Sequence, residues 1–344
     1  MLRIFFTELK KLIRINRLPL VILLAVAVRA VLCILPSVHE HPYSDEVYKS
    51  CTAQLEGRLT AEKTEYLNSR LAEIDELIGA YDEMQQRYTE GEITLDEYSA
   101  YTERHGRAKA EESTVRYLCR KCEALKGCSG FDRQLFYDTD WSDLFEDNGY
   151  DIVMLLAVLC IAVPAFDLEY SSGSRGLLLT SKRGKVQLAL SKLTAVWVTV
   201  FVLSCLMSAA RLGVFVYQNG LKYSDIPVGN ILLTDGFGST SLTEYYLKDS
   251  LIKALVWAMY SALMCLVAVL CGNLTFALTA GFIAGITPRI IQAGVQAGGG
   301  IIISGLRLVE MYPAYSDLPL MAGAALIKTA IVCIAAAAFW SRRE

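Results

Sequence analysis

The chain has little histidine and lacks the glycine-rich loop that nucleotide-hydrolysing proteins use to hold phosphate. A loop of the form GxxxxGK followed by Ser or Thr is missing, because Val186 follows Gly184-Lys185 and Leu179 occupies the position of the first glycine. The three histidines show none of the spacing to cysteine that a zinc site requires. We therefore expect neither enzyme activity nor a bound metal or cofactor in this chain.

A calcium loop is also missing, although acidic residues gather before the second apolar run. These acids are Asp138, Asp140, Asp143, Glu146 and Asp147. They lack the glycine and the ligand spacing of a calcium-binding loop, so we expect a solvated face. Among them Tyr137, Trp141 and Phe145 recur every four residues, a stripe suited to the outer membrane interface.

Hydrophobic residues make up 53% of the 344 residues, which indicates a protein that crosses a membrane several times. The net charge of −3 conceals a strong division. Residues 37–149 carry 13 basic and 25 acidic residues, a net charge of −12, while the remainder carries 20 basic and 11 acidic residues, or +9. An acidic insert within a basic membrane body gives no sign of nucleic-acid binding.

Six apolar runs are candidates for helices across a bilayer, whose apolar core requires about 20 residues. The predicted spans are residues 17–36, 150–166, 193–217, 251–271, 274–296 and 318–340. Residues 297–317 are predicted as an outer or re-entrant segment, although they could also continue the fifth span. The expected fold class is all-α, a polytopic membrane protein with a helical hairpin inserted between its first two helices.

Basic residues gather on one side of these spans, which places both termini in the cytoplasm of a multi-pass cell-membrane protein. They precede the first span, fill the segment after the second and close the chain, whereas the outer loop 218–250 has two basic residues against four acidic ones. Residues 1–16 place apolar side chains at helical spacing, which predicts an amphipathic helix in the inner interface. A charged flank of a signal anchor would give the same orientation.

The insert, residues 37–149, is predicted as an extracytoplasmic helical hairpin. Apolar residues recur at spacings of three and four from about 60 to 89, and a break follows at Gly91. Thr94 and Glu97 then form a capping box that starts a return helix. Two helices of this length would each reach about 45 Å.

The ten cysteines divide into six in or beside apolar runs and four in the insert. We expect the six to be small packing residues. In an oxidising compartment the other four permit disulfides, because reflecting the hairpin about its turn places Cys51 roughly opposite Cys128. We predict that bridge, with Cys119 and Cys122 either paired or free. A bridge between these two within one helix would require local distortion.

Charged residues inside apolar runs are candidates for a translocation path. Lys328 falls near the middle of the last span without an obvious carboxylate partner. Four more cations lie near span ends, where they can snorkel to the interface in a structural role: Arg29, Arg211, Lys253 and Arg289. We retain Lys328 and Arg29 as path candidates. The spans lack paired carboxylates, which argues against a carrier driven by coupled ions.

The segment 167–192 joins the second and third spans and is rich in positive charge. It contains Glu169 and Gly173, the run LLLTSKRGK at 177–185, and Lys192 at the start of the third span. Together with the run SLTEYYLKDSLIKALVWAM at 241–259, these features resemble the membrane subunits (permeases) of ABC-2 type transporters, in the branch with a large extracytoplasmic insert. The order of elements is similar along the whole chain, whereas the insert contains no motif of the family.

The resemblance implies two permease chains, identical or related, that lie in membrane lipid and bind two cytoplasmic ATPase subunits to export peptides, antibiotics or lipids. It also implies that a coupling helix after the second span sits in a groove of the ATPase. Carried onto this chain, the coupling residues are Glu169, Gly173, Arg175, Lys182, Arg183 and Lys185. An alternative of a different class is a membrane sensor or scaffold, whose hairpin detects a ligand and whose basic segment recruits a signalling partner.

Overall fold

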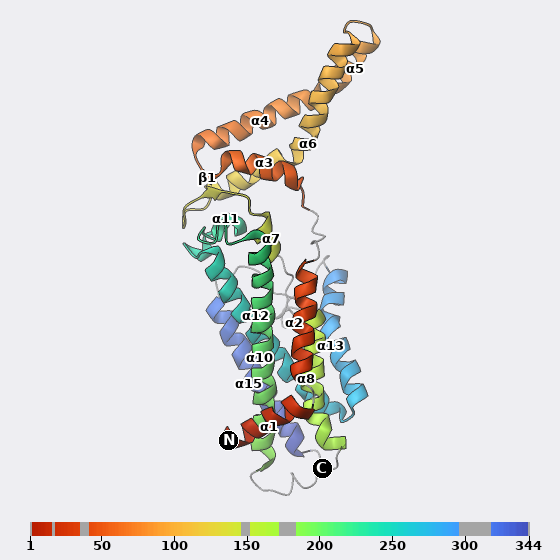
Figure 1. The fold of residues 1–344 in the computed structure, drawn as a ribbon, viewed down its shortest axis with the longest axis vertical. Coiled ribbons are helices and arrows are strands. Elements are labelled where there is room, and N and C mark those ends of the chain that lie inside the picture. The colour runs from red at the N-terminus through yellow and green to blue at the C-terminus, as the bar shows by residue number, and fades with distance from the viewer. Residues whose placement is uncertain are drawn as a thin grey trace. The chain divides into compact units, whose positions relative to one another are not determined.

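The computed structural model describes residues 2–15, 18–34, 41–145, 152–171, 184–295 and 318–342 (Figure 1). The chain is mostly helical, as the sequence predicts, and it divides into two compact units. The bundle unit comprises residues 1–36, 147–220 and 246–344, and the insert unit comprises residues 37–146 and 221–245. The insert unit is thus built from two separate segments, the second of which the sequence predicts only as a loop.

The bundle unit contains long helices that pack side by side. Its described helices are α1 (Leu2–Ile15), α2 (Leu18–Ile34), α8 (Ile152–Ser171), α10 (Gly184–Asn219), α12 (Leu242–Cys271, from residue 246 on), α13 (Leu274–Val295) and α15 (Leu318–Arg342). α10 contacts α1, α2, α8 and α15, and α13 packs against α8. The axis of α1 turns away from that of α2 by 64°. The two helices can be seen to run in different directions in Figure 1.

Two described helices are long and apolar enough to cross a membrane, namely Val186–Asn219 within α10 and the whole of α12. A third results if α1 and α2 are counted together as one bent span. Shorter apolar stretches occur in three further helices: Ile152–Phe166, Leu274–Ile286 and Leu326–Trp340. The lengths and compositions of the described helices are therefore compatible with a membrane protein.

Three helices extend beyond the spans that hydrophobicity predicts. α8 continues to Ser171 and α10 already begins at Gly184, so both enter the segment 167–192. α12 begins at Leu242, because the backbone N–H of Glu244 donates a hydrogen bond of 3.3 Å to the Ser241 hydroxyl and the first turn is thereby capped. Polar residues continue these helices because the backbone hydrogen bonds propagate once a turn has formed.

The insert unit is a helical hairpin on a small base. Its described elements are α3 (Asp45–Leu55), β1 (Gly57–Arg58), α4 (Ala61–Gly79), α5 (Tyr81–Thr89), α6 (Leu95–Lys126), β2 (Gln134–Leu135), α7 (Thr139–Phe145), α11 (Gly229–Leu232) and the 3₁₀ helix η1 (Asp235–Phe237). α6 packs against α3, α4 and α5, and β1 pairs antiparallel with β2. The predicted helical regions are both present, with a break between α4 and α5 at Ala80.

The turn of the hairpin follows the predicted local chemistry. The Glu97 backbone N–H donates to the Thr94 hydroxyl at 3.3 Å, and the Thr94 backbone N–H donates to the Glu97 carboxylate at 2.9 Å. This capping box is therefore confirmed. Gly91 has φ +77°, a left-handed conformation in which a side chain would be strained.

The second segment of the insert unit is held by polar side chains. Asn230 is fully buried, and its side-chain oxygen accepts a hydrogen bond of 2.7 Å from the Gln134 backbone N–H. The Asp235 carboxylate accepts hydrogen bonds from the backbone N–H groups of Ser129 and Gly130, at 2.8 and 2.9 Å. Hydrophobicity does not reveal these contacts, because both residues resemble ordinary turn residues in the sequence.

Trp141 corrects the predicted aromatic stripe. Its side chain is buried within the insert unit, and its indole N–H donates a hydrogen bond of 2.9 Å to the Lys222 carbonyl. A buried indole with a satisfied N–H belongs to a protein core rather than to a membrane interface. Trp141 thus fixes α7 to the segment that begins at residue 221.

Candidate functional site

Most of the predicted coupling residues lie outside the described part of the chain, namely Gly173, Arg175, Lys182 and Arg183. Glu169 belongs to the last turn of α8 and Lys185 to the first turn of α10, and their side chains also lie outside the description. The backbones of α8 and α10, which enter the segment from its two ends, are described. Lys192, the last residue of the segment, is described with its side chain and lies about two turns into α10.

Lys192 ties three helices together at the base of this segment. Its ammonium forms an ion pair of 3.2 Å with the Glu8 carboxylate of α1. The same ammonium donates a hydrogen bond of 3.1 Å to the backbone carbonyl of Ala165 in α8 and lies 5.9 Å from the centre of the Phe166 ring. Both charged side chains are only 5% exposed. A displacement of any of these helices therefore strains a buried ionic contact.

Glu8 is the member of this cluster that sequence reasoning missed. It shares its helix face with Phe5, Leu9 and Leu12, which contact or belong to the bundle core. Its carboxylate also accepts a hydrogen bond of 2.7 Å from Lys11. The sequence does contain a signal for Glu8, which is an acidic residue within an apolar stripe. Such a residue indicates a buried ion pair, because a buried carboxylate requires a cationic partner.

Three cations of the bundle unit line one open cavity. They are Arg29 from α2, Arg211 from α10 and Lys253 from α12. Their positions in the sequence predict separate snorkelling roles at span ends, whereas the fold brings all three to the same lining. We therefore regard this cavity as the candidate functional site of the bundle unit.

Hydroxyl groups and apolar side chains complete the lining. Ser204 and Ser208 occupy the same face of α10 as Arg211, and Ser250 and Tyr246 occupy the same face of α12 as Lys253. Apolar residues also line the cavity and are themselves at most 5% exposed: Met154, Met207 and Trp257. The site thus combines cationic and hydroxyl donors with an apolar floor, an arrangement typical of sites that orient a ligand.

Two contacts fix the position of α12 at this cavity. The Asp249 carboxylate, 4% exposed as a residue, pairs with the Lys253 ammonium at 2.8 Å. The Tyr246 hydroxyl donates a hydrogen bond of 2.9 Å to the Ser208 carbonyl of α10. The other carboxylate oxygen of Asp249 is buried without a hydrogen-bond partner among the described residues. The local network holds Lys253 and Tyr246 in place at the cavity wall.

The structure separates the two candidates for a translocation path. Arg29 lines the cavity with Arg211 and Lys253. Lys328, half-buried on α15, is not among the residues that line it. A path role for either residue stays a prediction. Arg29 shares a cavity lining with two other cations, Arg211 and Lys253, as a residue of a binding site would.

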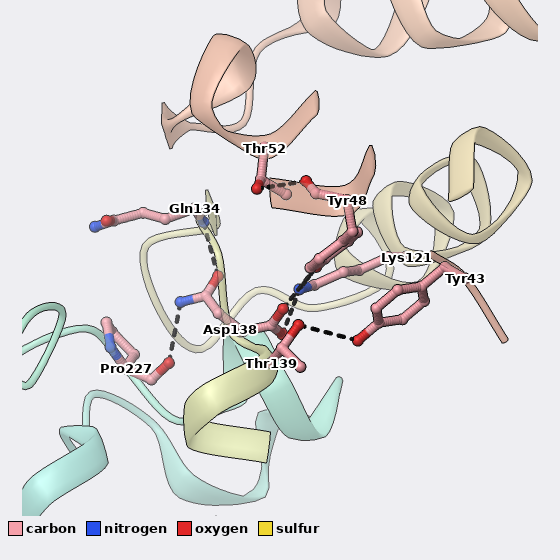
Figure 2. A network of polar contacts seen from close by, with 9 residues as sticks. Tyr43, Tyr48, Thr52, Lys121, Gln134, Asp138, Thr139 and Pro227 are labelled. Carbon is pink, nitrogen blue, oxygen red and sulfur yellow. Dashed lines mark hydrogen bonds and ion pairs between the residues drawn. The ribbon is translucent and has the colours of Figure 1, made fainter. Parts of the chain in front are cut away.

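The insert unit contains a buried polar network, shown in Figure 2. The Lys121 ammonium pairs with the Asp138 carboxylate at 2.5 Å, and the Tyr48 hydroxyl donates a hydrogen bond of 2.6 Å to the same carboxylate. The side chains of Lys121 and Asp138 are 2% and 3% exposed. Burial, together with the neighbouring Asp138 charge, raises the pKa of Tyr48, which therefore stays a neutral donor.

This network corrects the prediction of a solvated acidic face. Asp138 is a buried structural group, and Asp143 forms an ion pair of 3.2 Å with His41 when that histidine is protonated. Burial also raises the pKa of Asp140. Glu146 and Asp147 lie outside the described residues. Nowhere in the described residues do three or more His, Cys, Asp or Glu side chains come together as a metal site.

The four insert cysteines are free thiols in the structure. Cys51 lies near the charges of Glu111 and Arg70, whereas Cys128 lies near those of Asp235 and Arg133. Cys119 and Cys122 are buried one turn apart on α6. Disulfide formation stays a prediction about the oxidised protein.

Comparison with known proteins returns no match: no family model, curated protein or solved structure is similar to this chain at a significant level.

Proposed function

We propose that the chain is the permease subunit of an ABC-2 type exporter in the cell membrane, with both termini in the cytoplasm. A separate ATPase subunit supplies the energy by binding the segment 167–192, and a second permease chain completes the translocation path. The similarity of 167–192 and 241–259 to that family supports the proposal, as does the lack of a phosphate loop in the sequence. The cargo is a peptide, an antibiotic or a lipid-like molecule.

The proposal assigns the six spans to α2, α8, α10, α12, α13 and α15. α10 and α12 have the length and apolarity of a span, and α8, α13 and α15 contribute shorter apolar helices among the described residues. α2 meets the criterion for a span when it is counted together with α1. In this arrangement α1 lies at the cytoplasmic surface, where its exposed Arg3, Lys10 and Arg14 face headgroups or water. The insert unit is then extracytoplasmic.

The observation that carries the proposal is the contact of Lys192 with Glu8 and Ala165. It joins α10, α8 and α1 close to the point where α8 and α10 enter and leave the proposed coupling segment. A force applied to that segment by an ATPase is transmitted to three helices together, because none can move without breaking a buried ion pair or hydrogen bond.

A co-purification experiment tests this function. We expect an ATPase with a phosphate loop to co-purify with the tagged chain, and the K182Q/R183Q/K185Q variant to retain less than about a tenth of it because the docking charges are lost. The matched control is R3Q/K10Q/R14Q, which removes three exposed positive charges from α1 and should retain the ATPase. Both variants are first checked for normal abundance in the membrane.

The same experiment separates the sensor or scaffold alternative. Recovery of a signalling protein in place of an ATPase would favour that alternative. Equal ATPase recovery from the wild-type chain and K182Q/R183Q/K185Q would contradict the proposed coupling segment, even if an ATPase is the partner.

A further inference from the structure

The cavity lined by Arg29, Arg211 and Lys253 has the chemistry of a site for a phosphate group. The three cations come from three different helices, so they converge on the cavity through the fold and not through local sequence. Guanidinium groups bind phosphate oxygens through paired, charge-assisted hydrogen bonds, and Lys253 adds a point charge. Lys253 already pairs with the Asp249 carboxylate at 2.8 Å, so its charge is partly neutralised and the two guanidinium groups are the main candidates for contact with an anion.

The hydroxyl groups strengthen this interpretation. Ser204, Ser208 and Ser250 line the same cavity. Serine hydroxyls donate to phosphate oxygens that the cations leave open, and they also accept from a bound alcohol such as a glycerol hydroxyl. The combination recognises a phosphate ester better than a bare cation or a neutral solute.

The apolar surroundings indicate that the molecule is amphiphilic. Met154 and Trp257 line the cavity beside the cations. α2, which contributes Arg29, exposes Leu24, Val28 and Val31 on its surface. An acyl chain attached to a bound phosphate can lie along this exposed apolar face, which also contacts lipid in the proposed membrane orientation.

We propose that this cavity binds the phosphate headgroup of an amphiphile whose acyl chains lie along α2. The site lies near the end of α2, the start of α8 and the first turns of α12 that belong to the bundle unit. In the proposed topology, these helix ends form the outer half of the bundle. The inference rests on the proposed export function to the extent that it names a class of cargo, although binding itself requires no ATPase.

A binding assay on the purified full-length chain in detergent tests the proposal. The probe is phosphatidic acid with a fluorescent acyl chain, and its binding is followed by fluorescence anisotropy. We expect R29Q/R211Q to weaken binding about tenfold or more, because two guanidinium–phosphate contacts are lost. K10Q removes an exposed charge from α1 of the same unit and should change binding less than about twofold. R29K/R211K keeps both charges and should bind more tightly than R29Q/R211Q.

Competitors distinguish the source of the phosphate. Unlabelled phosphatidic acid should displace the probe, whereas glycerol 3-phosphate and diacylglycerol should require concentrations about a hundredfold higher, because each carries only half of the recognised molecule. Displacement by glycerol 3-phosphate at the concentration of phosphatidic acid would overturn the amphiphile assignment. Equal binding by the wild-type chain and a monodisperse R29Q/R211Q variant would overturn the site itself. Neither result depends on whether an ATPase co-purifies, so this failure is distinct from failure of the proposed function.

Discussion

The two units bury the same kind of ion pair for different purposes. In the bundle unit Lys192 pairs with Glu8 and also donates to a backbone carbonyl of a third helix. In the insert unit Lys121 pairs with Asp138, whose carboxylate also accepts from Tyr48. The first contact links helices around a segment that we propose to move, whereas the second closes the core of a small domain.

The surroundings of the two pairs explain the difference. The insert unit exposes acidic helices whose surface pairs, such as Arg116 with Asp75 at 2.9 Å, contribute little free energy in water. It therefore depends on its buried core and on one satisfied network. The bundle unit exposes apolar side chains such as Leu23 and Ile334, and the ion pair of Lys192 with Glu8 lies beside the proposed coupling segment.

The largest expected effect is that of removing Lys192. In K192A the Glu8 carboxylate would remain buried without this partner, and we expect about 3–5 kcal/mol less stability in α1 and the start of α10. Hydrogen exchange followed by mass spectrometry measures this loss separately in peptides of each unit. Exchange in α3 and α6 should be unchanged.

Two further variants sharpen this test. E8L/K192M removes both charges and should recover most of the lost protection, because a buried ion pair is often replaceable by apolar residues. K10A serves as the exposed control on α1. Equal protection of α1 in K192A and K10A would show that the Lys192 contact does not hold the three helices together.

The corresponding change in the insert unit is D138A, for which we also expect a loss of about 3–5 kcal/mol, because the Lys121 charge would be left buried. Faster exchange should appear in α3, α6 and α7 and should spare α1. D75A, at an exposed pair on the same hairpin, should cost less than about 1 kcal/mol. If D138A and D75A exchange alike, the buried network is not what stabilises the insert core.

An intermediate effect is expected where the second segment meets the base of the hairpin. A Cβ at Gly229 would lie 2.2 Å from a carbon of the Phe131 ring, so G229A should cost about 1–3 kcal/mol through displacement of that ring. G213A, on α10 of the bundle unit, has no atom within 4 Å of the added carbon and should be neutral or slightly stabilising. Thermal unfolding in detergent compares the two, and equal midpoints would contradict the packing of residue 229.

Local patterns predicted the helices of both units well, because their causes lie within a few residues. The capping box at Thr94 and the glycine break at Gly91 depend on neighbouring atoms alone. Helix ends at polar residues were missed, since hydrophobicity marks the apolar part of a helix and not its hydrogen-bonded extent. α10 thus begins at Gly184, nine residues before the apolar run.

Contacts between distant residues were not predictable in the same way. Asn230 looked like a loop residue, yet it is fully buried against the backbone of β2. Arg211 and Lys253 looked like isolated span-end cations, yet they share a cavity with Arg29. Asp138 was predicted to be solvated because nothing in its neighbourhood of the sequence announces Lys121. Such pairings follow from the packing of whole elements.

The smallest expected effect concerns thiol chemistry in the insert unit. Burial raises the pKa of Cys122 to about 11, so its thiolate fraction is small at neutral pH and rises about tenfold per pH unit up to that value. Alkylation of Cys122 by iodoacetamide, followed by peptide mass spectrometry, should therefore be slow at pH 8 and accelerate steadily to pH 10. Alkylation at pH 8 as fast as that of an exposed thiol would contradict the buried position of Cys122.

The most direct test of the account is photo-crosslinking from position 183 in intact cells. With a photoreactive amino acid in place of Arg183, the account predicts an adduct that contains a cytoplasmic ATPase with a phosphate loop. Crosslinking only to a protein on the outer side of the membrane, or labelling of this position by a reagent that cannot cross the membrane, would contradict it.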